Sequence, residues 1–315
     1  MKKSSLFFTV FFIMLFSAGN SSAKTYKFSG GPSGGTYQYY AGAIADLSSQ
    51  AGIKVKAVPS GGSIANIRLV NMGKSDFAVS YSGDIFRARN GMLTKDRRKY
   101  RDVFAIGRFY GAPAQLVVRA DSNITSASQL TGKKVGVGNF GSGAAGNCEL
   151  FFTEMGIWYA VDKEFLGYDN AAQAFNNRGI DAFWLFTGFP NASVKKVADQ
   201  NKITLLNVYN DAEKAGMFKK YPYFSKITIP ARTYKGVNSD TVTFQDSALW
   251  TVNKKVSEAD VYKLLKTVYS DEGLKYMVET HKSAKGMSIK NGISGIVTPL
   301  HPGAEKFWRE KGSLK

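Results

Sequence analysis

The segment YKFSGGPSGGTYQYYAGAIADL, residues 26–47, carries the pattern that sets the fold class. A short strand is predicted at residues 26–28, and it continues into a glycine-rich loop at residues 30–35. A helix follows, and its apolar side chains recur at a helical spacing that places them on one face. These side chains are Tyr37, Tyr40, Ile44 and Leu47. Residues 26–47 are therefore predicted to form a strand, a glycine loop and a helix.

The same order of elements repeats immediately afterwards. Residues 53–58 alternate apolar and polar side chains, as in a half-buried strand, and the loop 59–62 follows them. A second helix is predicted over residues 63–72 and another short strand over residues 77–80. This alternation of strands and helices predicts a parallel sheet that is covered by helices.

A second unit of the same kind begins near residue 115. Strands are predicted at residues 115–119 and 134–137, and a glycine loop at 138–143 leads into a helix that ends near Gly156. The remaining expected elements are strands at 203–208 and 249–252, a helix at 257–269 and helical structure near the C-terminus. Two similar units predict an α/β protein with two lobes joined by crossover strands.

The first 23 residues have the three parts of a cleaved secretory signal. Lys2 and Lys3 supply the positive start, residues 6–16 are almost entirely apolar, and small residues end at Ala23. The apolar run is too short for a membrane anchor, which needs about 20 residues. We therefore expect cleavage near Ala23 and a location in the periplasm. Cys148 is the only cysteine, so no intramolecular disulfide can form.

The chain is strongly basic, with 42 Lys and Arg against 24 Asp and Glu and a net charge of +18. A basic surface attracts anions. Nucleic acid is not expected as the partner, because the protein is predicted to be exported and because its basic residues are scattered along the sequence. An anionic ligand, an acidic docking surface and a merely solvated basic face all remain compatible with the charge.

Three glycine-rich loops each lie between a predicted strand and the start of a predicted helix. A helix N-terminus exposes unpaired N–H groups and a partial positive charge, and glycine lets a ligand approach the backbone. Such a site holds a carboxylate or a phosphate without a buried Arg. Any one loop could be an ordinary helix cap, but three loops across two lobes favour a shared ligand. The loops are Gly34-Gly35-Thr36, Ser60-Gly61-Gly62-Ser63 and Gly141-Ser142-Gly143.

Patterns typical of enzymes are present but incomplete. Residues 141–146 match G-x-G-x-x-G, and residues 31–35 match the G-x-S-x-G nucleophile elbow. The dinucleotide cofactor is scarce outside the cytoplasm, and the only histidines, His281 and His301, lie near the C-terminus. Two His and one Cys do not make a usual zinc site. We therefore expect no catalytic residue, no metal and no cofactor, and we expect Cys148 to be a small buried residue.

An ordered set of motifs resembles the TAXI family, the solute-binding subunits of one class of TRAP transporter. The resemblance covers essentially the whole chain after the predicted signal. The motifs are GGPSGGTY (30–37), SGGSIANIRL (60–69), KSDFA (74–78), LTGKKVGVG (130–138), GSG (141–143), TGFPN (187–191), YPYF (221–224) and TPLHPGAE (298–305).

The resemblance implies a type II periplasmic binding protein fold with two α/β lobes joined by two crossover strands. The first lobe would comprise residues 24–115 plus 248–315 and the second residues 116–247, with crossovers near 113–118 and 245–249. Members of this family bind small organic acids or amino acids such as glutamate. They deliver them to a TRAP-type integral membrane permease that an ion gradient drives. We expect a monomer that binds a carboxylate.

The resemblance also implies a set of ligand-binding residues. Those carried over are Gly35, Thr36, Tyr37, Ser60, Ser63, Asn66, Ser142 and Gly143. The chain departs from the family pattern at Asn139-Phe140 and at residues 81–84, which puts the identity of the ligand in doubt more than the fold.

Three further residues are candidates for the same site. Arg108 could pair with a ligand carboxylate in a bidentate manner, or it could form a structural ion pair. Tyr81 and Phe189, together with Tyr37, could provide apolar walls or belong to the core. The competing functions are a binding subunit for another transporter or a sensor kinase, an exported enzyme on the same fold, and a surface protein that binds anionic polymers.

Overall fold

The computed structural model describes residues 24–32, 35–93 and 96–314. The predicted signal peptide, residues 1–23, and Gly34 of the first loop lie outside the described residues. None of the helices in the described part of the chain is both long enough and apolar enough to cross a membrane.

The first unit has the predicted alternation of strands and helices. Strand β1 (Thr25–Ser29) pairs in parallel with β2 (Lys54–Val58) and with β3 (Phe77–Tyr81). Helices α1 (Thr36–Ser48) and α2 (Ser63–Asn71) connect them. The four aromatic and aliphatic residues predicted to share one face of α1 are all buried, so the helical spacing located the core face of α1 correctly.

The second unit repeats this construction. Strand β5 (Lys134–Gly136) pairs in parallel with β6 (Asp162–Glu164) and β7 (Ala182–Phe186). Helices α4 (Gly143–Glu154), α5 (Tyr168–Asn176) and α6 (Ala192–Gln200) accompany these strands. Cys148 lies in α4 and is fully buried, as expected.

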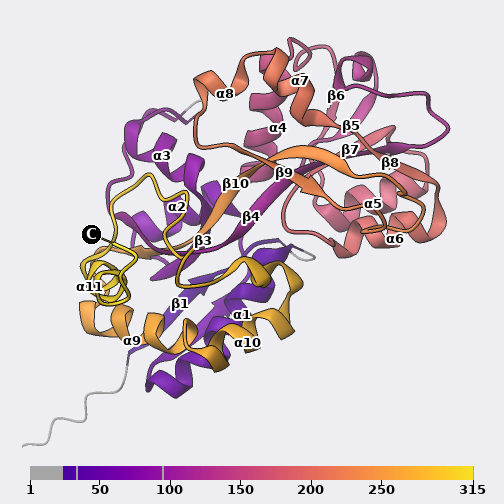
Figure 1. The fold of residues 1–315 in the computed structure, drawn as a ribbon. Coiled ribbons are helices and arrows are strands. Elements are labelled where there is room, and N and C mark those ends of the chain that lie inside the picture. The colour runs from indigo at the N-terminus through magenta and orange to yellow at the C-terminus, as the bar shows by residue number, and fades with distance from the viewer. Residues whose placement is uncertain (1–23, 33–34, 94–95, 315) are drawn as a thin grey trace, which may run out of the picture.

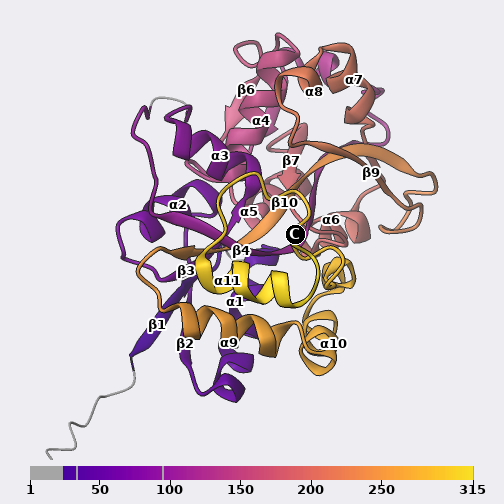
Figure 2. The same cartoon turned by 60° about the vertical axis from the view of Figure 1, so that its left-hand side comes forward.

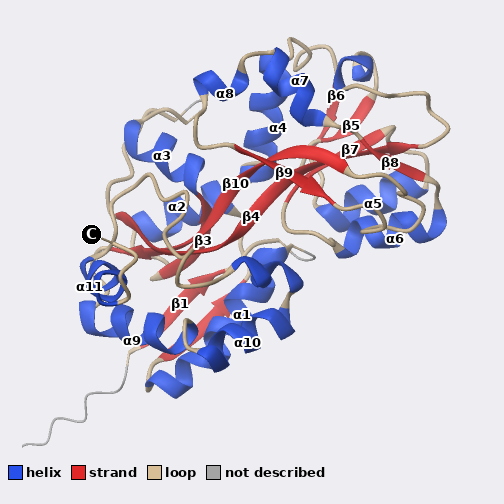
Figure 3. Cartoon of the chain, viewed as in Figure 1, coloured by secondary structure: helices blue, strands red, loops and turns tan. Residues whose placement is uncertain are grey.

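Two long antiparallel strands, β4 (Val103–Arg119) and β10 (Thr241–Asn253), run through the middle of the molecule (Figure 1). Residues 103–113 of β4 pair with β10, whereas residues 114–118 pair with β7. The resulting sheet has the strand order β2-β1-β3-β10-β4-β7-β5-β6 (Figure 3). The strands expected at 115–119 and 249–252 are therefore the ends of longer strands. We retain the lobe boundaries given above as a proposal.

The C-terminal part of the chain returns to the first lobe. Helices α9 (Glu258–Val268) and α10 (Asp271–Thr280) pack against α1, and α11 (Pro302–Glu310) packs against α9 and β4 (Figure 2). The remaining elements are η1 (Ser49–Ala51), α3 (Ser82–Asn90), η2 (Ala127–Leu130), β8 (Ile203–Leu205), α7 (Val208–Lys214), α8 (Met217–Lys220), β9 (Ser225–Ile229) and η3 (Lys282–Gly286). The strand predicted at 203–208 is shorter than expected, because α7 begins at Val208.

Packed aromatic rings fill the core of both lobes. In the first lobe Trp250 of β10 lies against Phe109, with ring centroids 5.5 Å apart, and against Phe77. In the second lobe Trp184 of β7 stacks on Phe151 at 5.6 Å. Large buried rings contribute substantial apolar area, and here they stabilise the central strands of the sheet.

Candidate functional site

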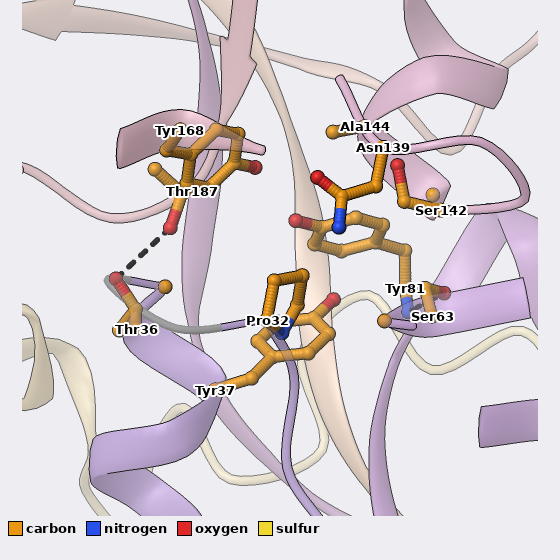
Figure 4. A pocket seen from close by; sticks show the side chains of 13 residues that line it. Pro32, Thr36, Tyr37, Ser63, Tyr81, Asn139, Ser142, Ala144, Tyr168 and Thr187 are labelled. Carbon is orange, nitrogen blue, oxygen red and sulfur yellow. Dashed lines mark hydrogen bonds between the residues drawn. The ribbon is translucent and has the colours of Figure 1, made fainter. Parts of the chain in front are cut away.

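Three helices, two from the first lobe and one from the second, begin at the same pocket. Gly35 precedes α1, Gly62 precedes α2, and Ser142 caps α4. All three residues line one pocket between the lobes (Figure 4). The full lining is Pro32, Gly35, Thr36, Tyr37, Gly62, Ser63, Tyr81, Asn139, Ser142, Gly143, Ala144, Tyr168 and Thr187.

Glycine is required where the loops of the two lobes approach each other. Gly62 has φ +97° and ψ −162°, a conformation that is open almost only to glycine. A Cβ atom at Gly62 would lie 3.5 Å from the Cβ atom of Ser142 in the other lobe. The α2 and α4 N-termini therefore face each other at close range.

Hydroxyl groups fix the loops from within. Ser142 Oγ accepts a hydrogen bond from the Ala145 N–H at 3.0 Å, which is a helix N-cap. Ser63 Oγ accepts from the Tyr81 N–H at 2.9 Å and ties the start of α2 to the end of β3. Both hydroxyls thus have a structural partner and also border the pocket.

Asn66 and Ser60 hold the first two loops in place from outside the pocket. Asn66 Nδ2 donates to the carbonyl oxygens of Gly30 and Val79, each at 2.7 Å, and Ser60 Oγ donates to Gly30 O at 2.9 Å. Neither residue lines the pocket. Asn66 and Ser60 therefore position the loops and do not contact the pocket themselves.

Three tyrosines form the aromatic walls. Tyr81 and Tyr168 both donate their hydroxyls to the Phe186 carbonyl oxygen, Tyr168 at 3.1 Å. Tyr37 Oη is buried and has no hydrogen-bond partner among the described residues. Burial raises the pKa of Tyr37 and of Tyr81 well above the ordinary value, so both stay protonated. The free Tyr37 hydroxyl is a donor that a ligand could use.

None of the described residues that line the pocket carries a charge, so the polarity of this lining comes from neutral donors and helix ends. Three helix N-termini at one place favour an anion, because their partial positive charges add. The cavity has a volume of about 30 Å³, far below the roughly 300–1,000 Å³ of sites for drug-sized ligands. The lobes are therefore in a closed arrangement, and a metabolite would need them to separate in order to enter.

Seven of the eleven residues expected at the site line this pocket, and four do not. The seven are Gly35, Thr36, Tyr37, Ser63, Tyr81, Ser142 and Gly143. The other four are Ser60, Asn66, Arg108 and Phe189. Arg108 lies on β4, and its Nε donates to Ser247 Oγ at 3.2 Å. Phe189 is partly buried and packs against the apolar core.

Sequence reasoning left several lining residues out of the expected set. Thr187 and Tyr168 come from segments of the second lobe that carry no glycine loop, and Asn139 precedes the third loop. Thr187 lies in the TGFPN motif, which was the one available signal for it. In the described residues no group of three or more His, Cys, Asp or Glu side chains is placed to hold a metal ion.

Two α/β lobes on a shared sheet, with a pocket between them, define the class of periplasmic binding protein folds. A putative L-cystine ABC transporter protein of Listeria monocytogenes is similar in structure (TM-score 0.52, 16% identity, 83% of this chain and 97% of that chain). So is a binding protein component of an ABC phosphonate transporter of Pseudomonas aeruginosa (TM-score 0.50, 13% identity, 82% and 78%). A third similar structure is a protein of Bordetella bronchiseptica RB50 (TM-score 0.53, 12% identity, 92% and 89%).

At these identities the similarity concerns the fold. The sequence itself matches the NMT1-like family over residues 28–312, and the chain belongs to that family.

Proposed function

We propose that the protein is a periplasmic solute-binding protein that captures a small anionic metabolite between its lobes and passes it to a membrane transporter. The observation that carries this proposal is the convergence of the α1, α2 and α4 N-termini on one pocket. Each lobe offers half of the site, so a ligand completes its hydrogen bonds only when the lobes close. A ligand that binds the closed form better shifts the protein toward it.

The proposed ligand contacts are the seven expected residues that line the pocket. Backbone N–H groups at the helix starts would hold one anionic group, and the hydroxyls of Thr36, Ser63 and Ser142 would add donors. Arg108 contributes no contact in this arrangement. A carboxylate is the ligand group that we favour, in an organic acid or a glutamate-like amino acid.

The transporter is proposed to be a TRAP-type permease, on the TAXI resemblance of the motifs. The alternative is an ABC transporter, which is supported by the names of two structural relatives. Reconstitution with each kind of permease discriminates between them. Uptake that requires an ion gradient and no ATP supports the first, and uptake that requires ATP supports the second.

A thermal-shift screen of the purified protein against organic acids and amino acids tests the binding function. A ligand at about 100 times its dissociation constant stabilises the folded state by about 2.7 kcal/mol, which raises the melting temperature measurably. An enzyme on the same fold would instead turn over a substrate. Failure of every anion in the screen to raise the melting temperature would contradict the proposal.

A further inference from the structure

A buried polar cluster lies behind the pocket, where α3, β10 and α4 meet. It contains Asp84 and Arg87 of α3, Asp246 of β10, and Tyr223 from the segment before β9, and we call these four residues the acidic cluster. Arg87 Nη2 donates to Asp84 Oδ1 at 2.5 Å. Asp84 is 0% exposed and Asp246 1% exposed, so both carboxyl groups are removed from water.

The charges in this cluster do not balance. Two carboxylates face one guanidinium, and the Tyr223 hydroxyl is buried and has no partner among the described residues. Among the described residues, Asp246 accepts hydrogen bonds only from two backbone N–H groups, those of Gly83 at 2.9 Å and Ser247 at 2.6 Å. An uncompensated buried negative charge is costly, and a bound proton removes it.

The surroundings of Asp246 explain why its carboxyl group takes up a proton. The pKa of Asp246 is raised to about 8, mainly because the carboxyl group is buried and also because of the nearby charge of Asp84. The Gly83 N–H, the Ser247 N–H and Arg87 act in the opposite direction. Arg108 of β4 donates to Ser247 Oγ and does not pair with Asp246. Burial also raises the pKa of Tyr223, which therefore stays neutral.

The second lobe covers the acidic cluster. A Cβ atom at Gly143, the first residue of α4, would lie 2.5 Å from Asp84 Oδ2, and one at Gly146 would lie 3.9 Å from Arg87 Nη2. The Tyr223 ring packs so closely on Gly83 that a side chain there would overlap it. In this arrangement α4 and Tyr223 rest on α3 and cover the acidic cluster.

We propose that lobe closure buries the acidic cluster and takes up one proton there, so that the clamp closes more readily at low pH. The inference rests on the proposed function, in which two hinged lobes close on a ligand, and it adds that pH regulates this closure. Gly143 borders both the acidic cluster and the ligand pocket. The proton and the ligand therefore favour the same closed arrangement.

The direction of the pH effect follows from linkage. In the open form Asp246 is hydrated and keeps an ordinary pKa, whereas in the closed form the pKa is raised, so the closed form binds more protons. The ratio of closed to open molecules then falls as pH rises toward the raised pKa, by up to about tenfold per pH unit, and becomes constant above it. Ligand affinity follows the same course.

Small-angle X-ray scattering of the ligand-free full chain between about pH 5 and pH 9 tests this inference. The wild-type radius of gyration should increase as pH rises, because open molecules accumulate. Asp246→Asn removes the titrating group and should flatten the response. Asp84→Asn lowers the charge imbalance and should weaken the response even if Asp246→Asn folds poorly. Asp199→Asn, at an exposed carboxyl group of α6, should behave like the wild type.

A wild-type radius of gyration that does not change with pH would overturn the inference. So would an unchanged response in both Asp246→Asn and Asp84→Asn. No ligand is present in this experiment, so its failure leaves the thermal-shift result untouched. Conversely, a failed ligand screen with a pH-dependent radius of gyration would count against the proposed function alone.

Discussion

Thr36 Oγ1 and Thr187 Oγ1 lie 2.9 Å apart, in a hydrogen bond that joins the first residue of α1 to the end of β7. Both side chains are buried, and both line the pocket (Figure 4). The bond spans the seam between the lobes at the wall of the proposed ligand site. The contact that holds the two lobes together therefore also forms part of the wall of the site, so the site is complete only when the lobes are closed.

Removing either hydroxyl should weaken ligand binding. Thr36→Val and Thr187→Val each remove one partner of the bond at nearly constant shape, at a cost of about 0.5–1.5 kcal/mol of binding free energy. The double variant should lose less than the sum of the two, because both substitutions remove the same interaction. Calorimetric titration of the wild type, the two single variants and the double variant, with the acid that gives the largest thermal shift, measures these losses of binding free energy. Fully additive losses would show that the two hydroxyls are not coupled.

Gly62→Ala should destabilise the protein by about 1–3 kcal/mol, because alanine is strained at the φ and ψ of Gly62. Gly42→Ala is the matched control. Gly42 lies inside α1, and a Cβ atom there would meet nothing within 4 Å. Alanine at that position should stabilise by about 0.5–1 kcal/mol. Urea unfolding measures the change in unfolding free energy for both variants. Equal changes would refute the claim that the backbone conformation at residue 62 requires glycine.

Asn66→Ala should cost about 1–3 kcal/mol of stability, because it removes a hydrogen-bond donor from the buried carbonyl groups of both Gly30 and Val79. Ligand affinity should fall as well, although Asn66 does not line the pocket, since the first loop loses its support. Asn90→Ala removes only an exposed bond to Phe86 O and should change stability by less than about 0.5 kcal/mol. Denaturant unfolding and calorimetry distinguish the two variants.

The unfolding free energy should depend on pH through Asp246. Its pKa is raised from 3.8 to about 8 in the folded chain, so the folded state holds a proton that the unfolded state releases. This contribution is largest below the unfolded pKa and declines as pH rises to about 8, with a slope approaching about 1.4 kcal/mol per pH unit. Unfolding of the wild type and Asp246→Asn at several pH values isolates it. Parallel curves for the two proteins would argue against a buried, protonated Asp246.

The sequence predicted the elements whose signals are local. Glycine loops mark the starts of α1, α2 and α4, and the regular spacing of Tyr37, Tyr40, Ile44 and Leu47 marks the buried face of α1. These signals sufficed for the α/β fold and for most of the pocket. Convergence of the three helix starts followed from the rule that ligands bind at the carboxyl ends of parallel strands.

The rest depends on contacts between distant residues. The full length of β4 was missed because Gly107, Gly111 and Pro113 interrupt its apolar run, and proline within a strand normally signals an edge or an end. Thr187 and Tyr168 reach the pocket through the packing of the second lobe. Arg108 lies close in sequence to the predicted crossover at residues 113–118, but this position does not show whether its side chain points into the pocket.

A single calorimetric experiment tests the central claim, that three helix starts from two lobes enclose one anion. Ala144 lies buried in the pocket wall, and Ala144→Leu fills part of the cavity. The exposed Ala192 of α6 provides the matched variant Ala192→Leu. With the acid that most raises the melting temperature, we predict one site per chain in the wild type and in Ala192→Leu. In Ala144→Leu we predict binding that is at least about tenfold weaker, or 1.4 kcal/mol. Wild-type affinity in Ala144→Leu would contradict the claim.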